Sequence, residues 1–292
     1  MKYVKYIMWT LLITSFATLV MAHTAWAGQT YYVATNGKDS GPGTQGNPWK
    51  TLAYAAGKVS PGDTVLIAKG TYKPFRIKRG GQRSAEVTFK ADSGAQGKVI
   101  ISGNDTYGVA VWNADYVEVE GVTITGSGRT GFLANQSDHV TLRNSKITNI
   151  GRACVHFVRS DFGTIEKNKI DNCGTNGPNG EGIYLGAPGS KKVKTRGHVV
   201  RNNAISNIKD EGVDLKPHSG DILIESNKIA DVQLRDGGAI HVRGSWHVIR
   251  NNNITNVKKG SKLMPGIDID PTAKNIALSN NTMTKTSGCK NC

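Results

Sequence analysis

The sequence is poor in helix-forming pattern, in long apolar runs and in cysteine. No apolar run beyond residue 27 is long enough to span a bilayer, so we expect no membrane insertion of the mature chain. The Leu-x-x-Leu-x-Leu phrase of leucine-rich repeats is absent, which excludes that class of solenoid. Basic motifs with interleaved aromatic residues, as in nucleic-acid-binding modules, are also absent. We therefore expect no nucleic-acid partner.

The first 27 residues have the pattern of a secretory signal. A basic head with Lys2 and Lys5 precedes an uncharged apolar stretch, Ile7 to Met21, and Ala25-Trp26-Ala27 offers a cleavage site. We predict that residues 1–27 are removed and that the chain is secreted or periplasmic, as a monomer. Loss of the two lysines lowers the formal charge from +15 to +13. This positive charge favours a polyanionic partner, and for an exported chain we expect an acidic polysaccharide.

One short phrase recurs four times in the second half of the chain. In each copy a small residue is followed by strict alternation of an aliphatic residue with another type, the period of a strand with one buried face. The copies are Gly182–Gly186, Gly212–Lys216, Ala239–Arg243 and Gly266–Asp270. Their aliphatic residues are predicted to point inward: Ile183, Leu185, Val213, Leu215, Ile240, Val242, Ile267 and Ile269.

A second phrase, an aliphatic pair followed by Asn, recurs between the copies of the first. The aliphatic residues that close it, from Ile124 to Met283, follow one another at steps of 23 to 35 residues, a period typical of a solenoid. Asn tolerates a left-handed backbone at the repeated bend, and its side chain is expected to hydrogen-bond to the next rung. The pattern predicts an all-β, single-domain, right-handed parallel β-helix of about ten coils over residues 63–286.

Residues 28–62 are predicted to cap the open N-terminal end of this solenoid. A strand begins at Thr30, and residues 49–59 have an amphipathic helical pattern that ends at Ser60-Pro61-Gly62. The predicted inner face of the helix is formed by Trp49, Leu52, Ala53, Ala56 and Val59. We expect this short helix to lie across the end, because the apolar core would otherwise meet water there.

The four cysteines are candidates for disulfides in an exported chain. Cys154 and Cys173 are 19 residues apart, close to one coil, and are expected on neighbouring rungs. Cys289 and Cys292 lie in the tail 287–292 and are expected to form a terminal staple. A redox or zinc role is disfavoured, because no βαβ context and no second Cys or His pair accompanies them.

Stacking the four phrases on neighbouring rungs, about 4.8 Å apart, gathers ionisable side chains on one outer face. One outward column is expected to contain Tyr184, Asp214, His241 and Asp268, and a second Gly186, Lys216, Arg243 and Asp270. His156 is expected above Tyr184, and three acids, Glu181, Asp210 and Glu211, precede their strands. Adjacent cations repel, which would move Lys216 towards service as a base, and the neighbouring acids offer oxygen ligands for a divalent cation, Ca²⁺.

These groups suit β-elimination from a uronate polymer. Arg243 or a bound cation would neutralise the sugar carboxylate, and Lys216 would remove the proton α to it. His241 or Tyr184 would protonate the leaving oxygen. Asp214, Asp268 and His156 are assigned to substrate binding, and Glu181, Asp210 and Glu211 to the metal.

The sequence also resembles exported β-helix polysaccharide lyases of the pectin-lyase-like type. Its opening carries Tyr31-Tyr32-Val33, Pro48-Trp49-Lys50-Thr51-Leu52, Pro61-Gly62-Asp63-Thr64-Val65 and Gly70-Thr71-Tyr72. The order Glu211-x-x-x-x-Lys216, followed by Val242-Arg243-Gly244, resembles the chondroitinase B and alginate lyase family. That resemblance implies a calcium ligand at Glu211, the base at Lys216 and the carboxylate-binding arginine at Arg243. The family has an acidic residue where this chain has Lys209, with Asp210 adjacent.

Three other functions remain open at this stage. A C5-epimerase would use the same proton abstraction. A glycoside hydrolase would use two of Asp214, Asp268 and Asp270 as acid and base, although the compact Asp-Asp and Gly-His-Gly signature of β-helix hydrolases is absent. A non-catalytic carbohydrate-binding protein would leave these charges as a solvated face of the sheet, stabilised by cross-rung pairs.

Overall fold

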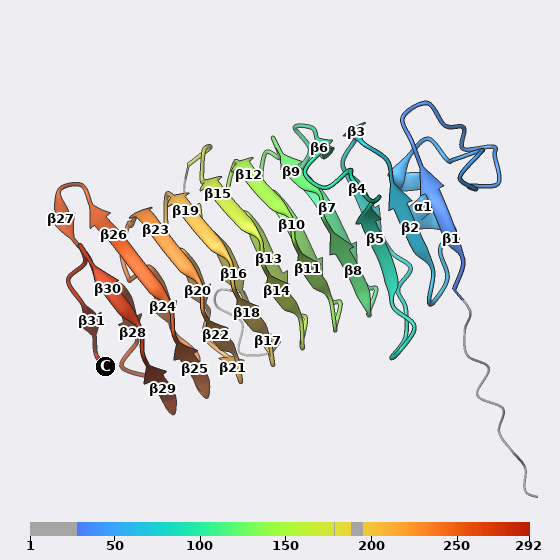
Figure 1. The fold of residues 1–292 in the computed structure, drawn as a ribbon. Coiled ribbons are helices and arrows are strands. Elements are labelled where there is room, and N and C mark those ends of the chain that lie inside the picture. The colour runs from blue at the N-terminus through green and yellow to red at the C-terminus, as the bar shows by residue number, and fades with distance from the viewer. Residues whose placement is uncertain (1–27, 178, 188–194) are drawn as a thin grey trace, which may run out of the picture.

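The computed structural model describes residues 28–292 except 178 and 188–194. Three long sheets run the length of the molecule, and each turn of the chain contributes one strand to each sheet (Figure 1). The predicted secretory signal, residues 1–27, lies outside the described residues. In the part of the chain that is described, no helix is both long and apolar enough to cross a membrane.

The strands stack in parallel in all three sheets, apart from the antiparallel pair β26/β27. Sheet I contains β1 (Thr30–Val33), β2 (Thr64–Ile67), β5 (Val87–Ala91), β8 (Val117–Glu120), β11 (Thr141–Arg143), β14 (Thr164–Glu166), β18 (Val199–Arg201), β22 (Leu223–Glu225), β25 (His247–Arg250) and β29 (Ile276–Ser279). Sheet II contains β3 (Gly70–Tyr72), β6 (Val99–Ser102), β9 (Thr123–Thr125), β12 (Lys146–Ile150), β15 (Lys169–Cys173), β19 (Ala204–Ile208), β23 (Lys228–Gln233), β26 (Asn253–Lys259), β27 (Lys262–Leu263) and β30 (Thr282–Thr284). Sheet III contains β4 (Phe75–Ile77), β7 (Tyr107–Trp112), β10 (Thr130–Asn135), β13 (Val155–Val158), β16 (Ile183–Leu185), β20 (Val213–Leu215), β24 (Ile240–Val242), β28 (Ile267–Ile269) and β31 (Cys289–Lys290). A short pair, β17 (Thr195–Arg196) and β21 (Ser219–Gly220), lies outside them.

The predicted parallel β-helix is confirmed, with about nine turns rather than ten. The first complete turn is β2, β3 and β4, while β1 adds a strand to sheet I without completing a turn. The alternating aliphatic residues point inward as predicted, and those on β16, β20 and β24 are 0% exposed. One continuous core therefore runs between the three sheets.

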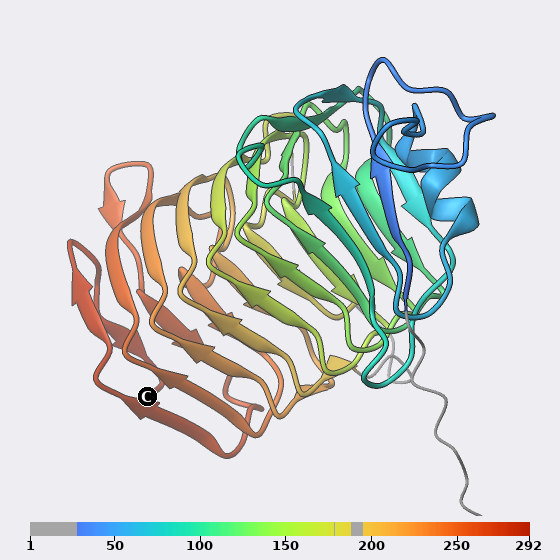
Figure 2. The same cartoon turned by 45° about the vertical axis from the view of Figure 1, so that its right-hand side comes forward.

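The helix is shorter than predicted and uses a slightly different face. Helix α1 spans Leu52–Lys58, and the Oγ1 of Thr51 accepts a hydrogen bond from the amide of Tyr54 at its start. Ala55 is buried and Ala53 is exposed, because the helix begins three residues later than Trp49. Trp49 instead pairs with Val33 at the end of β1 and is buried there. Figure 2 shows α1 at the N-terminal end of the solenoid, where a cap was expected.

At each bend, the left-handed backbone and the side-chain hydrogen bonds that were predicted for a single Asn belong to two successive residues. The first, for example Asn202 with φ 56° or Asn251 with φ 57°, has the left-handed backbone. The second has a buried side chain that continues a ladder from rung to rung: Asn168, Asn203, Asn227, Asn252 and the partly buried Asn281. From Asn203 onward each Oδ1 in this ladder accepts from the amide and side chain of the Asn one rung before, at 3.0–3.1 Å.

Both expected disulfides are present. Cys154 bonds to Cys173, with a Cα–Cα distance of 5.5 Å, and joins the start of β13 to the end of β15 on the next rung. Cys289 bonds to Cys292 at the end of the chain. The predicted tail also contains a strand, β31, which pairs with β28 and extends sheet III.

The contribution of the Asn ladder to the stability of the fold can be tested by substitution. Replacing Asn227 with Ala would leave the buried amide of Asn203 without an acceptor, which costs about 1–3 kcal/mol. We expect thermal or denaturant unfolding to show that loss. Asn104→Ala, at an exposed position, should leave stability within about 0.5 kcal/mol. Equal stability of the two variants would contradict a structural role for the ladder.

Candidate active site

The outward column of sheet III forms in the predicted register. Parallel pairing sets Tyr184 opposite Asp214 and Asp214 opposite His241. His156 and Asp268 extend the column at its two ends. These five side chains come from β13, β16, β20, β24 and β28, so each lies one strand spacing from the next.

The second column forms beside it. The amide of Lys216 donates to the carbonyl of Leu185, and the amide of Arg243 donates to that of Leu215 one rung later. Gly186 lies directly before Lys216 in this stack, and a Cβ added to it would be 3.0 Å from the Cβ of Lys216. Glycine at that place leaves the lysine stem free space.

Asp214 lies between the two cations. Its side chain is 0% exposed, its Oδ2 is 2.5 Å from Nζ of Lys216, and its Oδ1 accepts from Nη2 of Arg243. Burial raises the pKa of Asp214, whereas Lys216 and Arg243 oppose that rise. The expected repulsion between Lys216 and Arg243 is thus offset, because both cations pair with the same carboxylate. Because Asp214 is enclosed, it holds Lys216 and Arg243 in place and does not itself face a polymer.

Tyr184 and His156 form a stacked pair beside this triad. Their ring centroids are 4.3 Å apart, and Nζ of Lys216 lies 4.5 Å from the centre of the Tyr184 ring. Burial raises the pKa of Tyr184 above its usual range. Burial also lowers the pKa of His156 to about 4, so the neutral ring donates from Nε2 to the carbonyl of Gly186 at 3.0 Å.

His241 is held by Glu211 and not by Asp214, its neighbour in the column. Its Nδ1 is 3.1 Å from Oε1 of Glu211, which is also 3.7 Å from Nη2 of Arg243. Burial on its own would raise the pKa of Glu211, but the hydrogen bond with His241 and the charge of Lys216 outweigh it, and the pKa is lowered.

Three buried carboxyl groups lie together where the strands of the site begin. Oxygen atoms of Glu181, Asp210 and Glu211 lie within 4.8 Å of one another. Burial and the neighbouring carboxylates raise the pKa of Glu181 to about 7 and that of Asp210 to about 8. Oε2 of Glu181 has no hydrogen-bond partner among the described residues. The structure brings together the residues predicted as metal ligands, and their oxygen atoms fit a hard divalent cation.

The remaining predicted acids stand apart from this centre. Asp268 is buried and pairs through Oδ2 with Nζ of Lys290 at 3.0 Å. Asp270 bonds to the amide and hydroxyl of Thr272, which lowers its pKa. Both carboxylates are therefore engaged by partners within the chain.

Sequence reasoning missed two arginines beside the site. Arg129 and Arg152 line a hollow of about 190 Å³ together with His156, Glu181 and Tyr184. The amide of Arg152 donates to the carbonyl of Arg129, so the two are stacked on neighbouring rungs. The sequence did contain a signal for these two arginines. Each stands three residues before an inward-pointing residue of its strand, which is the position that Asp210 has relative to Val213.

Comparison with known families places most of the chain in one of them. Residues 31–236 match the family model described as the Pel9A-like right-handed β-helix region. A curated relative, the Bacillus subtilis (strain 168) protein YwoF, is 36% identical over 91 residues. That alignment covers 31% of this chain and 18% of the relative, so the chain spans only a small part of it.

Solved structures share the fold at low sequence identity. An alginate lyase from Paenibacillus sp. str. FPU-7 superposes with a TM-score of 0.70 and 21% identity, covering 82% of this chain and 96% of that one. Pectate lyase Pel9A superposes with a TM-score of 0.64 and 17% identity, covering 90% of this chain and 78% of that one. Glycoside hydrolases share the same β-helix fold.

The shared carboxylate at the centre of the site can be tested through stability. Asp214→Asn would leave two cations side by side in a half-buried place, and we expect a loss of about 2–3 kcal/mol in unfolding free energy. Glu225→Gln is the matched control, because Glu225 pairs with the exposed Arg250 on another sheet and should cost less than about 1 kcal/mol. Similar losses in both variants would contradict the central role of Asp214.

Proposed function

The chain belongs to the Pel9A-like right-handed β-helix family, and from this membership and the geometry of the site we propose an exported polysaccharide lyase. Its substrate would be an anionic, uronate-containing polysaccharide cleaved by β-elimination. The observation that carries the proposal is the arrangement of Lys216 and Arg243 around the buried Asp214.

Arg243 is assigned to the sugar carboxylate. Its side chain is 24% exposed, and Asp214 holds the guanidinium through Nη2, so the exposed part of the guanidinium would meet an incoming oxyanion. A guanidinium presents its donors in a fork that fits a carboxylate. Neutralising that carboxylate makes the neighbouring carbon acid easier to deprotonate.

Lys216 is assigned as the base. Its Nζ is held at 2.5 Å from Oδ2 of Asp214, and the reaction requires Lys216 as the free amine. The amine then takes the proton α to the carboxylate, the C–H electrons form the double bond, and the glycosidic C–O bond breaks. Asp214 is a positioning residue in this scheme, since it acts through Lys216.

Tyr184 is assigned to protonate the leaving oxygen. Its ring lies beside Nζ of Lys216, and its raised pKa keeps the phenol protonated at neutral pH. His241 is the other candidate from the sequence, with Nδ1 held by Glu211 and Nε2 as the nitrogen that would donate to the leaving oxygen. With Tyr184 as the acid, His241 would serve to orient Glu211.

Glu181, Asp210 and Glu211 would hold a calcium ion. Their three buried carboxyl groups, with one unpartnered oxygen atom on Glu181, are the feature that supports this assignment. When bound, the cation would share in neutralising the sugar carboxylate. The resembled family has an acidic ligand where this chain has Lys209. In this proposal Glu181, on the preceding rung, would take the place of that ligand.

Charge and disulfides support the setting of the reaction. The formal charge of +13 that remains without residues 1–27 suits a polyanion, and the two disulfides suit an oxidising compartment outside the cytosol. A hydrolase remains the second candidate, because Glu181 and Asp210 are neighbouring carboxyl groups with raised pKa values, as an acid catalyst needs.

The reaction is tested by ultraviolet absorbance of the unsaturated uronate product. We expect wild type to give this absorbance on one or more of alginate, pectate, glucuronan and chondroitin or dermatan sulfate. Lys216→Ala should lose at least about 100-fold in rate. Lys228→Ala, an exposed lysine on sheet II, should retain full activity.

Other outcomes of the same assay point elsewhere. Absorbance that survives in Lys216→Ala would keep the lyase and refute the assigned base. New reducing ends without absorbance would indicate hydrolysis, and a changed uronate configuration without cleavage would indicate epimerisation.

The metal site is tested by stability against pH. Glu181 and Asp210 have folded-state pKa values raised to about 7 and about 8, so with EDTA their contribution to stability falls as pH rises from about 4.5 to 8. Calcium should raise the melting temperature at pH 8 and give heat in a calorimetric titration. Both effects should be much reduced in Glu181→Gln and unchanged in Glu86→Gln, an exposed control. Equal calcium responses in the two variants would refute the site.

A further inference from the structure

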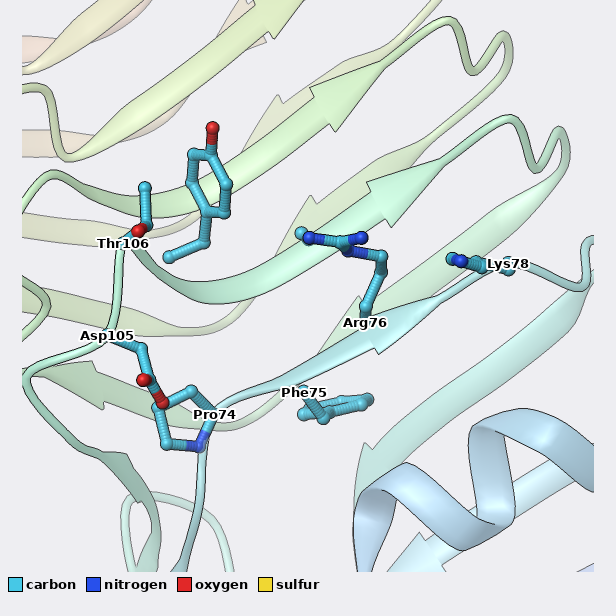
Figure 3. A pocket seen from close by; sticks show the side chains of 8 residues that line it. Pro74, Phe75, Arg76, Lys78, Asp105 and Thr106 are labelled. Carbon is cyan, nitrogen blue, oxygen red and sulfur yellow. The ribbon is translucent and has the colours of Figure 1, made fainter.

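A second and larger hollow lies on the same sheet, towards its N-terminal end. It has a volume of about 430 Å³ and is lined by Arg76 and Lys78 from β4 and its end, and by Thr106, Tyr107 and Ala110 from β7 and the segment before it. Figure 3 shows Arg76 and Lys78 rising from β4, with Asp105 and Thr106 on the opposite side of the hollow. Arg76 and Lys78 are both exposed.

The cations of this hollow are free for an anion. Across the described ranges, 28–177, 179–187 and 195–292, neither Arg76 nor Lys78 has a carboxylate within salt-bridge distance. Asp105 is the one acid in the lining, so the two cations leave a net positive charge. Unpaired cations facing a concave surface favour an anionic ligand.

Aromatic rings stand next to these cations. The guanidinium of Arg76 lies 5.0 Å from the ring centre of Trp112, and Tyr107 packs edge-on against the same ring at 6.4 Å. Trp112 holds the guanidinium over its ring face. Tyr107, which lines the hollow, offers an apolar surface for the carbon face of a pyranose. A charged group beside an aromatic surface is the chemistry that an acidic sugar needs.

The hollow is aligned with the active site. Arg76 pairs with Ala110, and the same column continues through Leu133, His156 and Tyr184 to Asp214. Five strand spacings of about 4.8 Å place Arg76 about 24 Å from Asp214 along the axis. The hollow of Arg129 and Arg152 lies between the two. A chain laid along sheet III would pass over all three.

We propose that the Arg76–Lys78–Tyr107 hollow is a distal subsite for an anionic polysaccharide, which holds an acidic sugar of the same chain whose other part lies at Lys216. This inference rests on the proposed function for its ligand class. Only long chains would occupy the subsite and the active site together, because a trisaccharide at Lys216 does not span about 24 Å.

Binding without cleavage tests the subsite. Calorimetry at fixed ionic strength would compare the Lys216→Ala chain with the same chain carrying Arg76→Ala and Lys78→Ala. The ligands are long chains of the polymer that wild type cleaves and its trisaccharides, with dextran as a neutral polymer. We expect the affinity for long chains to fall about tenfold or more, and that for trisaccharides to stay the same.

A charge-matched control separates a site from general attraction. Lys146→Ala with Lys169→Ala removes two stacked cations from sheet II and should change the affinity for long chains less than about twofold. An equal loss in this control, or no loss in the Arg76/Lys78 variant, would overturn the subsite while leaving the active site standing. Binding of dextran as tight as that of the polyanion would also overturn it. Failure of all anionic ligands, trisaccharides included, to bind would overturn both proposals.

A second readout does not depend on the charge of the variant. In the Lys216→Ala chain, long anionic chains should change the fluorescence of Trp112, and a Trp112→Phe version should lose that part of the change. Sulfated and carboxylated polymers compared at equal charge would identify the anionic group that Arg76 and Lys78 prefer. A fluorescence change that persists in Trp112→Phe would count against the hollow.

Discussion

The fixed spacing between turns governs this molecule, because every side chain lies about 4.8 Å from its equivalent on the next rung. Inside the bends this repetition is favourable. Asn227, for example, accepts from Asn203 on the rung before it and donates to the carbonyl of Val200. On the outer face the same repetition brings like charges together. Their repulsion is relieved where a neighbour of opposite charge lies between them. Asp214 has that role between Lys216 and Arg243.

The balance of charge on sheet III changes along the axis. Arg76 and Lys78 stand at the N-terminal end, Arg129 and Arg152 follow at the edge, and the carboxyl cluster lies next to the triad of Asp214. The three acids have no cation of their own at close range among the described residues apart from the contacts of Glu211. Such an arrangement costs stability when the chain is alone, and the proposed ligands of opposite sign would offset that cost.

The sequence predicted the architecture and the columns because both follow from a period of two residues and a repeat of fixed register. It placed Tyr184, Asp214 and His241 on neighbouring strands, as the structure has them. It could not predict which partner each charged group takes. His241 turns to Glu211 and not to Asp214, a choice made by side-chain torsion angles that no spacing encodes. It also placed Glu181 and Glu211 directly before their strands, where the structure has them, but it did not predict that both are buried.

Glycine explains how these side chains obtain their positions. Gly237 has φ 75°, and a Cβ added there would lie 2.5 Å from Nδ1 of His241, the atom that meets Glu211. Any larger residue would push the ring away from that carboxylate. Gly186 keeps space beside Lys216 in the same way. The aliphatic residues of the repeat phrase thus build the core, and glycines in or just before the phrase leave the space in which charged groups meet.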